Sequence, residues 1–176
     1  MIIAEEKKKN NIAEYVLYMW QVEDLIRAFN LDLEEIRKQV IKKYDQPPEK
    51  MEEIDAWYEN LVDRMKMENI QQQGHLRFVE DTIDELNLLH KQLLKEQDKQ
   101  YSQLYEQALP NIMEFRKKSK NDTDHDIKVC FNALYAYLLL RLKQDDISTE
   151  TQDAVSTFSN MLRYLSTKYH ENKNNS

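Results

Sequence analysis

The segment "NIAEYVLYMWQVEDLIRAF", residues 11–29, is apolar along most of its length but carries Glu23, Asp24 and Arg27 in its middle. Glu23 and Arg27 are four residues apart, so in a helix their side chains share a face and can form an ion pair. Trp20 precedes them on the same side of that helix. Three interpretations stay open: a structural ion pair that fixes a neighbouring helix, a polar pocket beside Trp20 that binds a small ligand, or a contact with another subunit.

Carboxylates also recur at helical spacing at positions 49–53 and 80–85, a pattern that could hold magnesium between two helices. Metal sites in helical bundles need carboxylates that project into the core. On a helical wheel, Glu49 and Glu53 lie away from the apolar stripe of their helix. Asp81 and Glu85 likewise lie away from the apolar stripe of theirs. We therefore interpret both groups as solvated surface and predict no metal site and no cofactor.

The histidines and the single cysteine form no catalytic pattern. His90 falls on the apolar face of its helix, where a core histidine with a hydrogen-bond partner is the usual case. The segment "DTDHD", residues 122–126, is metal-like in composition, but helix capping explains it better. Cys130 lies in an apolar helix, which favours a buried and unreactive thiol. No catalytic residue is assigned, and the candidates for a ligand or interaction site are Trp20, Glu23, Asp24, Arg27, Trp57 and His90.

The composition predicts an all-α protein. The 176 residues include one glycine and three prolines, whereas strands and tight turns depend on both residue types. A single glycine also excludes the glycine-rich phosphate loops of nucleotide-binding folds. The formal net charge of −7 disfavours nucleic acid as a partner, because binding to phosphate backbones depends on basic residues.

The sequence gives no sign of a membrane or secreted protein. One cysteine cannot form an intramolecular disulfide, and the N-terminus lacks a basic region followed by an apolar run. The longest nearly uncharged stretch, "VCFNALYAYLLL", residues 129–140, is shorter than the roughly 20 residues of a bilayer span. We therefore expect a soluble cytoplasmic protein with no membrane partner.

The apolar periodicity predicts a single-domain bundle of six or seven helices over residues 1–170, followed by a disordered tail at 171–176. The first helix (residues 4–30) and the sixth (residues 124–143) are apolar on nearly all sides, so both are expected at the centre of the bundle. The only glycine, Gly74, is expected to mark the break before the fourth helix.

Several segments resemble a bacterial family of all-helical proteins of about this length. They are "IAEYVLYMWQVEDLIRAF", "DQP", "WYENLVDRM", "QGHL" and the C-terminal "FSNMLRYLSTKYHE". The family is a domain of unknown function, known mainly from gut anaerobes. The resemblance implies a helical fold and a bacterial cytoplasmic setting, and it supplies no activity and no functional residue.

These observations favour a non-enzymatic interaction or scaffolding module whose partner is a second copy of the chain or another protein. The alternative is a small-molecule-binding or hydrolytic protein with a pocket near Trp20, Glu23, Arg27 and Trp57. The oligomeric state in solution and the presence of a cavity near these residues distinguish the two.

Overall fold

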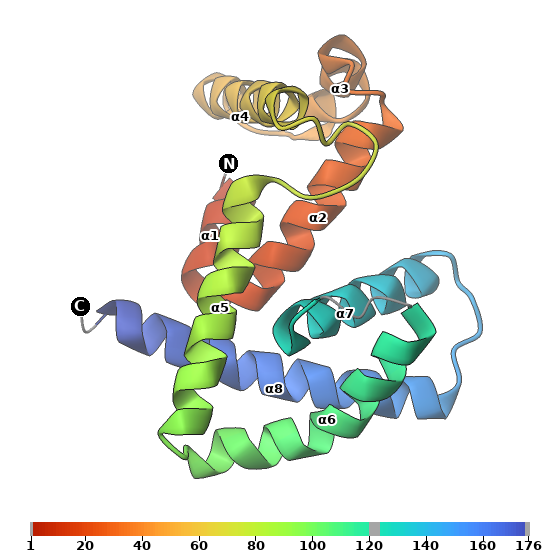
Figure 1. The fold of residues 1–176 in the computed structure, drawn as a ribbon. Coiled ribbons are helices and arrows are strands. Elements are labelled where there is room, and N and C mark those ends of the chain that lie inside the picture. The colour runs from red at the N-terminus through yellow and green to blue at the C-terminus, as the bar shows by residue number, and fades with distance from the viewer. Residues whose placement is uncertain (1, 120–123, 175–176) are drawn as a thin grey trace. The chain divides into compact units, whose positions relative to one another are not determined.

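The computed structural model describes residues 2–119 and 124–174, and over these residues it contains helices and no strand (Figure 1). The all-α prediction is therefore confirmed. The helices of the described residues are α1 (Ile2–Asn10), α2 (Ile12–Ala28), α3 (Leu33–Gln39), the short 3₁₀ helix η1 (Ile41–Lys43), α4 (Pro48–Met67), α5 (Arg77–Lys95), α6 (Lys99–Ser119), α7 (Asp126–Leu142) and α8 (Thr149–Asn174). The expected count of six or seven is not confirmed.

The extra helix arises because the expected first helix is divided in two at Asn11. The Asn11 side-chain oxygen accepts a hydrogen bond from the Ala13 amide at 3.1 Å, as a residue at a helix start does. The Ser166 hydroxyl accepts another from the Ile12 amide at 3.0 Å. Both amides belong to the first turn of α2 and would lack a partner if they were not capped in this way. Apolar periodicity continues across this break, so a wheel alone does not detect it.

The chain divides into two compact units, Met1–Lys9 with Glu14–Asp81, and Asn10–Ala13 with Thr82–Ser176. One boundary falls inside α5, so no change of composition marks it. That residues 1–170 fold as one domain stays a prediction.

In the first unit, α3 packs against α4 (Figure 1). Asp32 caps α3 by accepting hydrogen bonds from the amides of Glu34 and Glu35 at 3.0 and 3.2 Å. The guanidinium of Arg37 holds both carboxylate oxygens of Asp55 at 2.7 Å, which joins α3 to α4. This hydrogen bonding lowers the pKa of Asp55.

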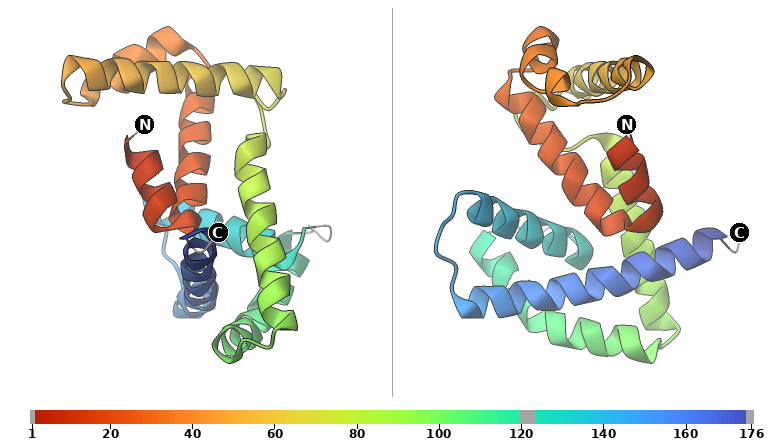
Figure 2. Two further views of the ribbon diagram at one scale, coloured as in Figure 1. Left: turned by 90° about the vertical axis from the view of Figure 1, so that its left-hand side faces the viewer. Right: turned by 180° about the vertical axis from the view of Figure 1, so that it is seen from behind.

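In the second unit, α6, α7 and α8 pack against one another (Figure 2). Their shared core is apolar and includes Ala108, Ile112, Ile127, Phe131, Phe158, Met161, Leu162 and Leu165. Pro110 lies inside α6, which continues from Lys99 to Ser119.

The position expected for α7 is only half correct. Its first half is buried through Ala133, but Leu139, Leu140 and Leu142 are 36%, 39% and 66% exposed. The prediction of a central helix is not confirmed, because apolar composition shows that a helix needs neighbours and not that the fold supplies them. At the C-terminus, α8 continues through residues 171–174, where a disordered tail was expected, and residues 175–176 lie outside the described residues.

Candidate functional site

Glu23 is a fully buried carboxylate whose two oxygens both accept hydrogen bonds. It lies on α2 and has no exposed surface. Its Oε1 accepts from the Leu76 amide at 3.0 Å, and its Oε2 lies 2.7 Å from Nδ1 of His75. A buried carboxylate is tolerated when N–H groups replace the water it has lost. Both partners come from the α4–α5 connection, residues 68–76, so Glu23 fixes that connection on α2.

The His75 imidazole is oriented by a second contact. Its ring stacks on Trp20, with the centroids 4.1 Å apart and the planes 13° from parallel. Because a carboxylate accepts and cannot donate, Nδ1 carries the proton shared with Glu23, and in the neutral ring Nε2 carries the lone pair. The His75 side chain is 22% exposed. Over the described residues, Nε2 forms no hydrogen bond and is not among the buried unpaired atoms, so it meets solvent.

Arg27 holds the same connection from the other side. Its guanidinium donates to Asp24 at 2.9 Å, to the Ile70 carbonyl at 3.2 Å and to the Gly74 carbonyl. The expected Glu23–Arg27 pair is therefore wrong. The spacing allows that pair, but His75 and the Leu76 amide occupy Glu23, and Arg27 turns to Asp24 one residue further along. Partners distant in sequence displaced the local one.

The backbone of residues 68–76 is shaped to bring these groups together. Gly74 has φ of +96°, a conformation that side chains disfavour, and a Cβ there would lie 3.2 Å from Ile70. The Glu68 carboxylate accepts from the Arg77 amide at 2.7 Å, which satisfies a donor in the first turn of α5. Gly74 thus marks the break before α5, as expected.

The six candidate residues do not form one site. Trp20 and Glu23 meet at His75, and Asp24 and Arg27 pair beside them. Trp57 lies on α4, where its ring meets Tyr58 edge to face at a centroid distance of 5.0 Å. His90 belongs to the second unit.

His90 is a core histidine with a hydrogen-bond partner, as expected. Its Nδ1 lies 2.7 Å from the Tyr101 hydroxyl, and its ring meets Tyr105 edge to face at 4.9 Å. The Tyr105 hydroxyl donates to Asp126 at 2.6 Å, and Arg116 donates to the same carboxylate at 2.5 Å. Burial lowers the pKa of His90, so the imidazole is held in its neutral form.

The capping interpretation of "DTDHD" and the buried thiol also agree with the structure. His125 Nδ1 accepts from the Lys128 amide at 3.2 Å at the start of α7, while Asp122 and Thr123 lie outside the described residues. Burial raises the pKa of the Cys130 thiol, which keeps it protonated. No group of three or more His, Cys, Asp or Glu suited to a metal ion occurs over 2–119 and 124–174.

Sequence reasoning missed His75, the residue on which this site is built. The contact between His75 and Glu23 spans 52 residues along the chain. The signal that could have found it is Glu23 itself, because a carboxylate on a buried face requires an N–H partner from elsewhere. His75 and its neighbour Leu76 follow the only glycine, at a helix start where free amides are expected.

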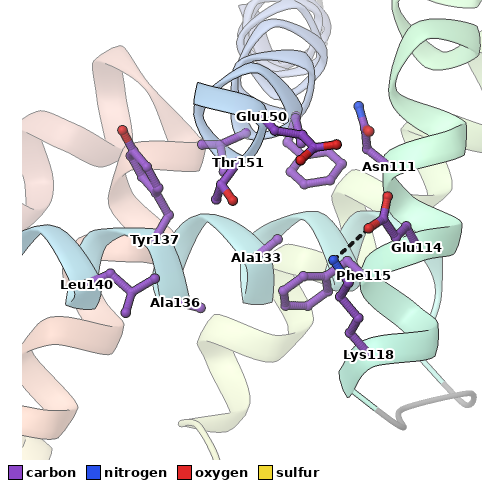
Figure 3. Close-up of a pocket in the computed structure, with 13 residues that line it drawn as sticks. Asn111, Glu114, Phe115, Lys118, Ala133, Ala136, Tyr137, Leu140, Glu150 and Thr151 are labelled. Atoms are coloured by element: carbon purple, nitrogen blue, oxygen red, sulfur yellow. Dashed lines mark ion pairs between the residues drawn. The ribbon is translucent and has the colours of Figure 1, made fainter. Parts of the chain in front are cut away.

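A pocket of about 290 Å³ lies in the second unit between α6, α7 and the start of α8 (Figure 3). Its apolar lining includes Phe115, Ala133, Ala136, Tyr137, Leu140 and Phe158. Polar side chains lie around it, among them Glu150 and the ion pair of Lys118 with Glu114 at 2.6 Å. None of the six sequence candidates lines this pocket.

Comparison with known families gives a match over the whole chain. Residues 1–176 match the model of a family described as Domain of unknown function (DUF4924). The chain belongs to this family. Neither a curated protein nor a solved structure matches it. For this member of the family, none of the described helices combines the length and apolar character that a membrane span requires.

Proposed function

We propose that the protein is a helical interaction module that pairs with a second copy of itself through the C-terminal half of α7, residues 134–142. The observation that carries this proposal is the exposure of core-type residues. Eight of the nine residues in "LYAYLLLRL" are apolar, and none of the nine is buried. A contiguous apolar surface of this kind marks a protein–protein contact in a stable protein.

The pocket beside residues 134–142 supplies the complementary half of such a contact. Its volume of about 290 Å³ suits the insertion of apolar side chains such as leucine from a partner. Leu139 and Leu142 project from the same helix that lines the pocket with Ala133 and Ala136. In a two-fold dimer each copy presents the same patch, so one patch must carry both the inserting side chains and the cavity that receives them. This patch does.

Charge at the rim is compatible with self-association. The chain as a whole carries −7, which opposes contact between two copies. Around the pocket, however, Glu114 is neutralised by Lys118, and Glu150 lines the pocket while Arg141 lies over the ring of Tyr137, another lining residue. A second copy therefore meets opposite charges at this patch and not a field of one sign.

The alternative of a small-molecule or hydrolytic pocket at the α2 charges has less support. Both oxygens of Glu23 are already hydrogen-bonded, and Arg27 is occupied by Asp24 and two carbonyls. The 290 Å³ pocket lies in the other unit. The cytoplasmic setting stays a prediction from the sequence.

The test is the molar mass in solution, measured by light scattering after size-exclusion chromatography. The wild type and the variant Met67→Glu are expected to be dimers, because Met67 is 79% exposed but belongs to α4 in the other unit and not to residues 134–142. The double variant Leu139→Glu, Leu142→Glu is expected to be a folded monomer. A wild type that stays monomeric at high concentration, or a double variant that stays dimeric, contradicts the proposal.

A further inference from the structure

We propose that His75 is a phosphoryl acceptor, and that its Nε2 takes a phosphoryl group from an energy-rich donor such as an acyl phosphate or a phosphoramidate. The proposal goes beyond the interaction role and concerns the other unit of the chain. It stands on the position of one imidazole, which is held by three restraints and open at one atom.

The first restraint is Glu23, which fixes the proton. Its carboxylate lies 2.7 Å from Nδ1, so the proton stays on that nitrogen and the lone pair stays on Nε2. The carboxylate also stabilises the positive charge that the ring acquires when Nε2 forms a bond. A carboxylate paired with the far nitrogen of a histidine generally fixes the tautomer and the orientation of the ring.

The second and third restraints fix the ring in space. Trp20 stacks on one face of it, and Arg27 holds the carbonyl of Gly74, the residue before His75. The ring therefore loses little conformational freedom on reaction, which favours a positioned nucleophile. A histidine with a purely structural role at a helix start would not need these restraints. Glu23 already caps the helix through the Leu76 amide, without the imidazole.

The surroundings suit a phosphoryl group more than other electrophiles. Residues 69–76 contain no carboxylate, although the chain as a whole is acidic. Gln72 and Gln73 are exposed on this stretch, and their amides are hydrogen-bond donors suited to phosphoryl oxygens. Over the described residues Nε2 forms no hydrogen bond, so the donor or its enzyme is expected to supply the groups that stabilise the transition state.

The step balances without a further reactant. The Nε2 lone pair forms the N–P bond while the bond from phosphorus to the leaving group of the donor breaks in line. The leaving group keeps that electron pair: an acyl phosphate releases a carboxylate, which needs no proton, and a phosphoramidate takes a proton from water and releases ammonia or an amine. The Nδ1 proton remains between His75 and Glu23, and the product is an Nε2-phosphohistidine.

The experiment exposes the full-length protein to phosphoramidate in one arm and to acetyl phosphate in the other, at alkaline pH. Intact-mass measurement counts the groups added, and peptide mapping with phosphorus NMR assigns them. We expect one acid-labile group on Nε2 of His75, added faster than to His125 or His170 and faster than to His75 in the urea-unfolded chain. Reaction with acetyl phosphate identifies an acyl phosphate as a competent source. Reaction with phosphoramidate alone points to an N-phosphoryl donor.

Two variants test the roles of the residues. His75→Ala removes the label. Glu23→Gln keeps the shape and one acceptor but loses the charge, and it slows labelling by roughly ten- to a hundredfold, the range for losing a carboxylate that orients a histidine. If Glu23→Gln does not fold, the labelling rates of His75, His125 and His170 in the wild type still test the proposal. Equal rates at His75, His125 and His170, an unchanged rate in folded Glu23→Gln, or no labelling in either arm overturns the proposal.

Discussion

Two regions of the molecule reverse the usual distribution of side chains. Around Glu23 and Arg27, charged groups lie where a core is expected, and both Glu23 oxygens and the Arg27 guanidinium are hydrogen-bonded. Along residues 134–142 of α7, leucines and tyrosines lie where a surface is expected. The first region shows that burial of a charge depends on the donors and acceptors supplied to it. The second shows that apolar residues stay exposed when the chain's own helices do not cover them.

The two regions also differ in how they relate to sequence distance. The hydrogen-bond partners of the buried charges come from a connection far along the chain, with separations of 52 residues for Glu23–His75 and 43 for Arg27–Ile70. Leu139, Leu140 and Leu142 instead remain 36%, 39% and 66% exposed. Truncating a side chain in the first region should therefore lower the free energy of unfolding. Truncating one in the second region should weaken only the association of two copies.

The largest effect is expected for Glu23→Ala. The change leaves the buried Leu76 amide without an acceptor and removes the partner of Nδ1 of His75. We expect the free energy of unfolding to fall by about 3 kcal/mol, the lower end of the range for breaking a buried pair. Urea unfolding measures it, with Glu59→Ala on the exposed face of α4 as the control, expected within about 0.5 kcal/mol of wild type. A loss no larger than that of the control would mean that the carboxylate is not buried in solution.

Arg27→Ala should cost less, because the Arg27 side chain keeps 15% of its surface exposed and water can reach part of the site. We expect a loss of about 2 kcal/mol from the stranded carbonyls of Ile70 and Gly74. Arg27→Lys should recover only part of it, because one ammonium cannot reach Asp24 and both carbonyls in the geometry of a planar guanidinium. Full recovery by lysine would show that charge alone matters there. The two variants are compared by the same unfolding experiment.

Much of the fold could be read from local sequence. Asp32 at the start of α3, Pro48 at the start of α4 and the tolerated Pro110 in α6 all act within one or two turns of helix. The break at Asn11 was not predicted, because it depends on a hydrogen bond from the Ile12 amide to the hydroxyl of Ser166, far along the chain. Local rules describe local structure, and the interruption of a long apolar helix is decided by tertiary contacts.

The site was predicted less well for the same reason. Glu23 was recognised as out of place, but its spacing suggested Arg27 as the partner. The true partner, His75, lies in a connection whose path is set by Gly74 and the loop geometry, which helical periodicity does not describe. The exposed half of α7 was missed because a helical wheel reports which faces are apolar and not how many neighbours the fold provides.

The pH dependence of stability tests the burial of His90 in the second unit. Burial lowers the pKa of His90, so between that lowered value and the ordinary value of about 6.5 the unfolded chain binds a proton that the folded chain does not. The stabilising contribution is complete above the ordinary pKa and is lost as the pH falls through this window. Tyr101, Tyr105 and Asp126 surround the ring, so His90→Gln should flatten this part of the stability profile. An identical profile in the variant would assign the acid sensitivity to another group.

The smallest effect on folding is expected at the exposed end of α7. Leu142 is 66% exposed, so Leu142→Ser should change the stability of the isolated monomer by less than about 0.5 kcal/mol. The matched core change, Leu165→Ala on α8, removes a fully buried leucine and should cost about 2–5 kcal/mol. Association adds a second signature, because a dimer interface stabilises the folded chain by mass action. The wild-type melting temperature should therefore rise with protein concentration, and that of Leu142→Ser should rise less. If the two melting curves shift equally with concentration, residues 134–142 do not form the interface and another surface holds the two copies together.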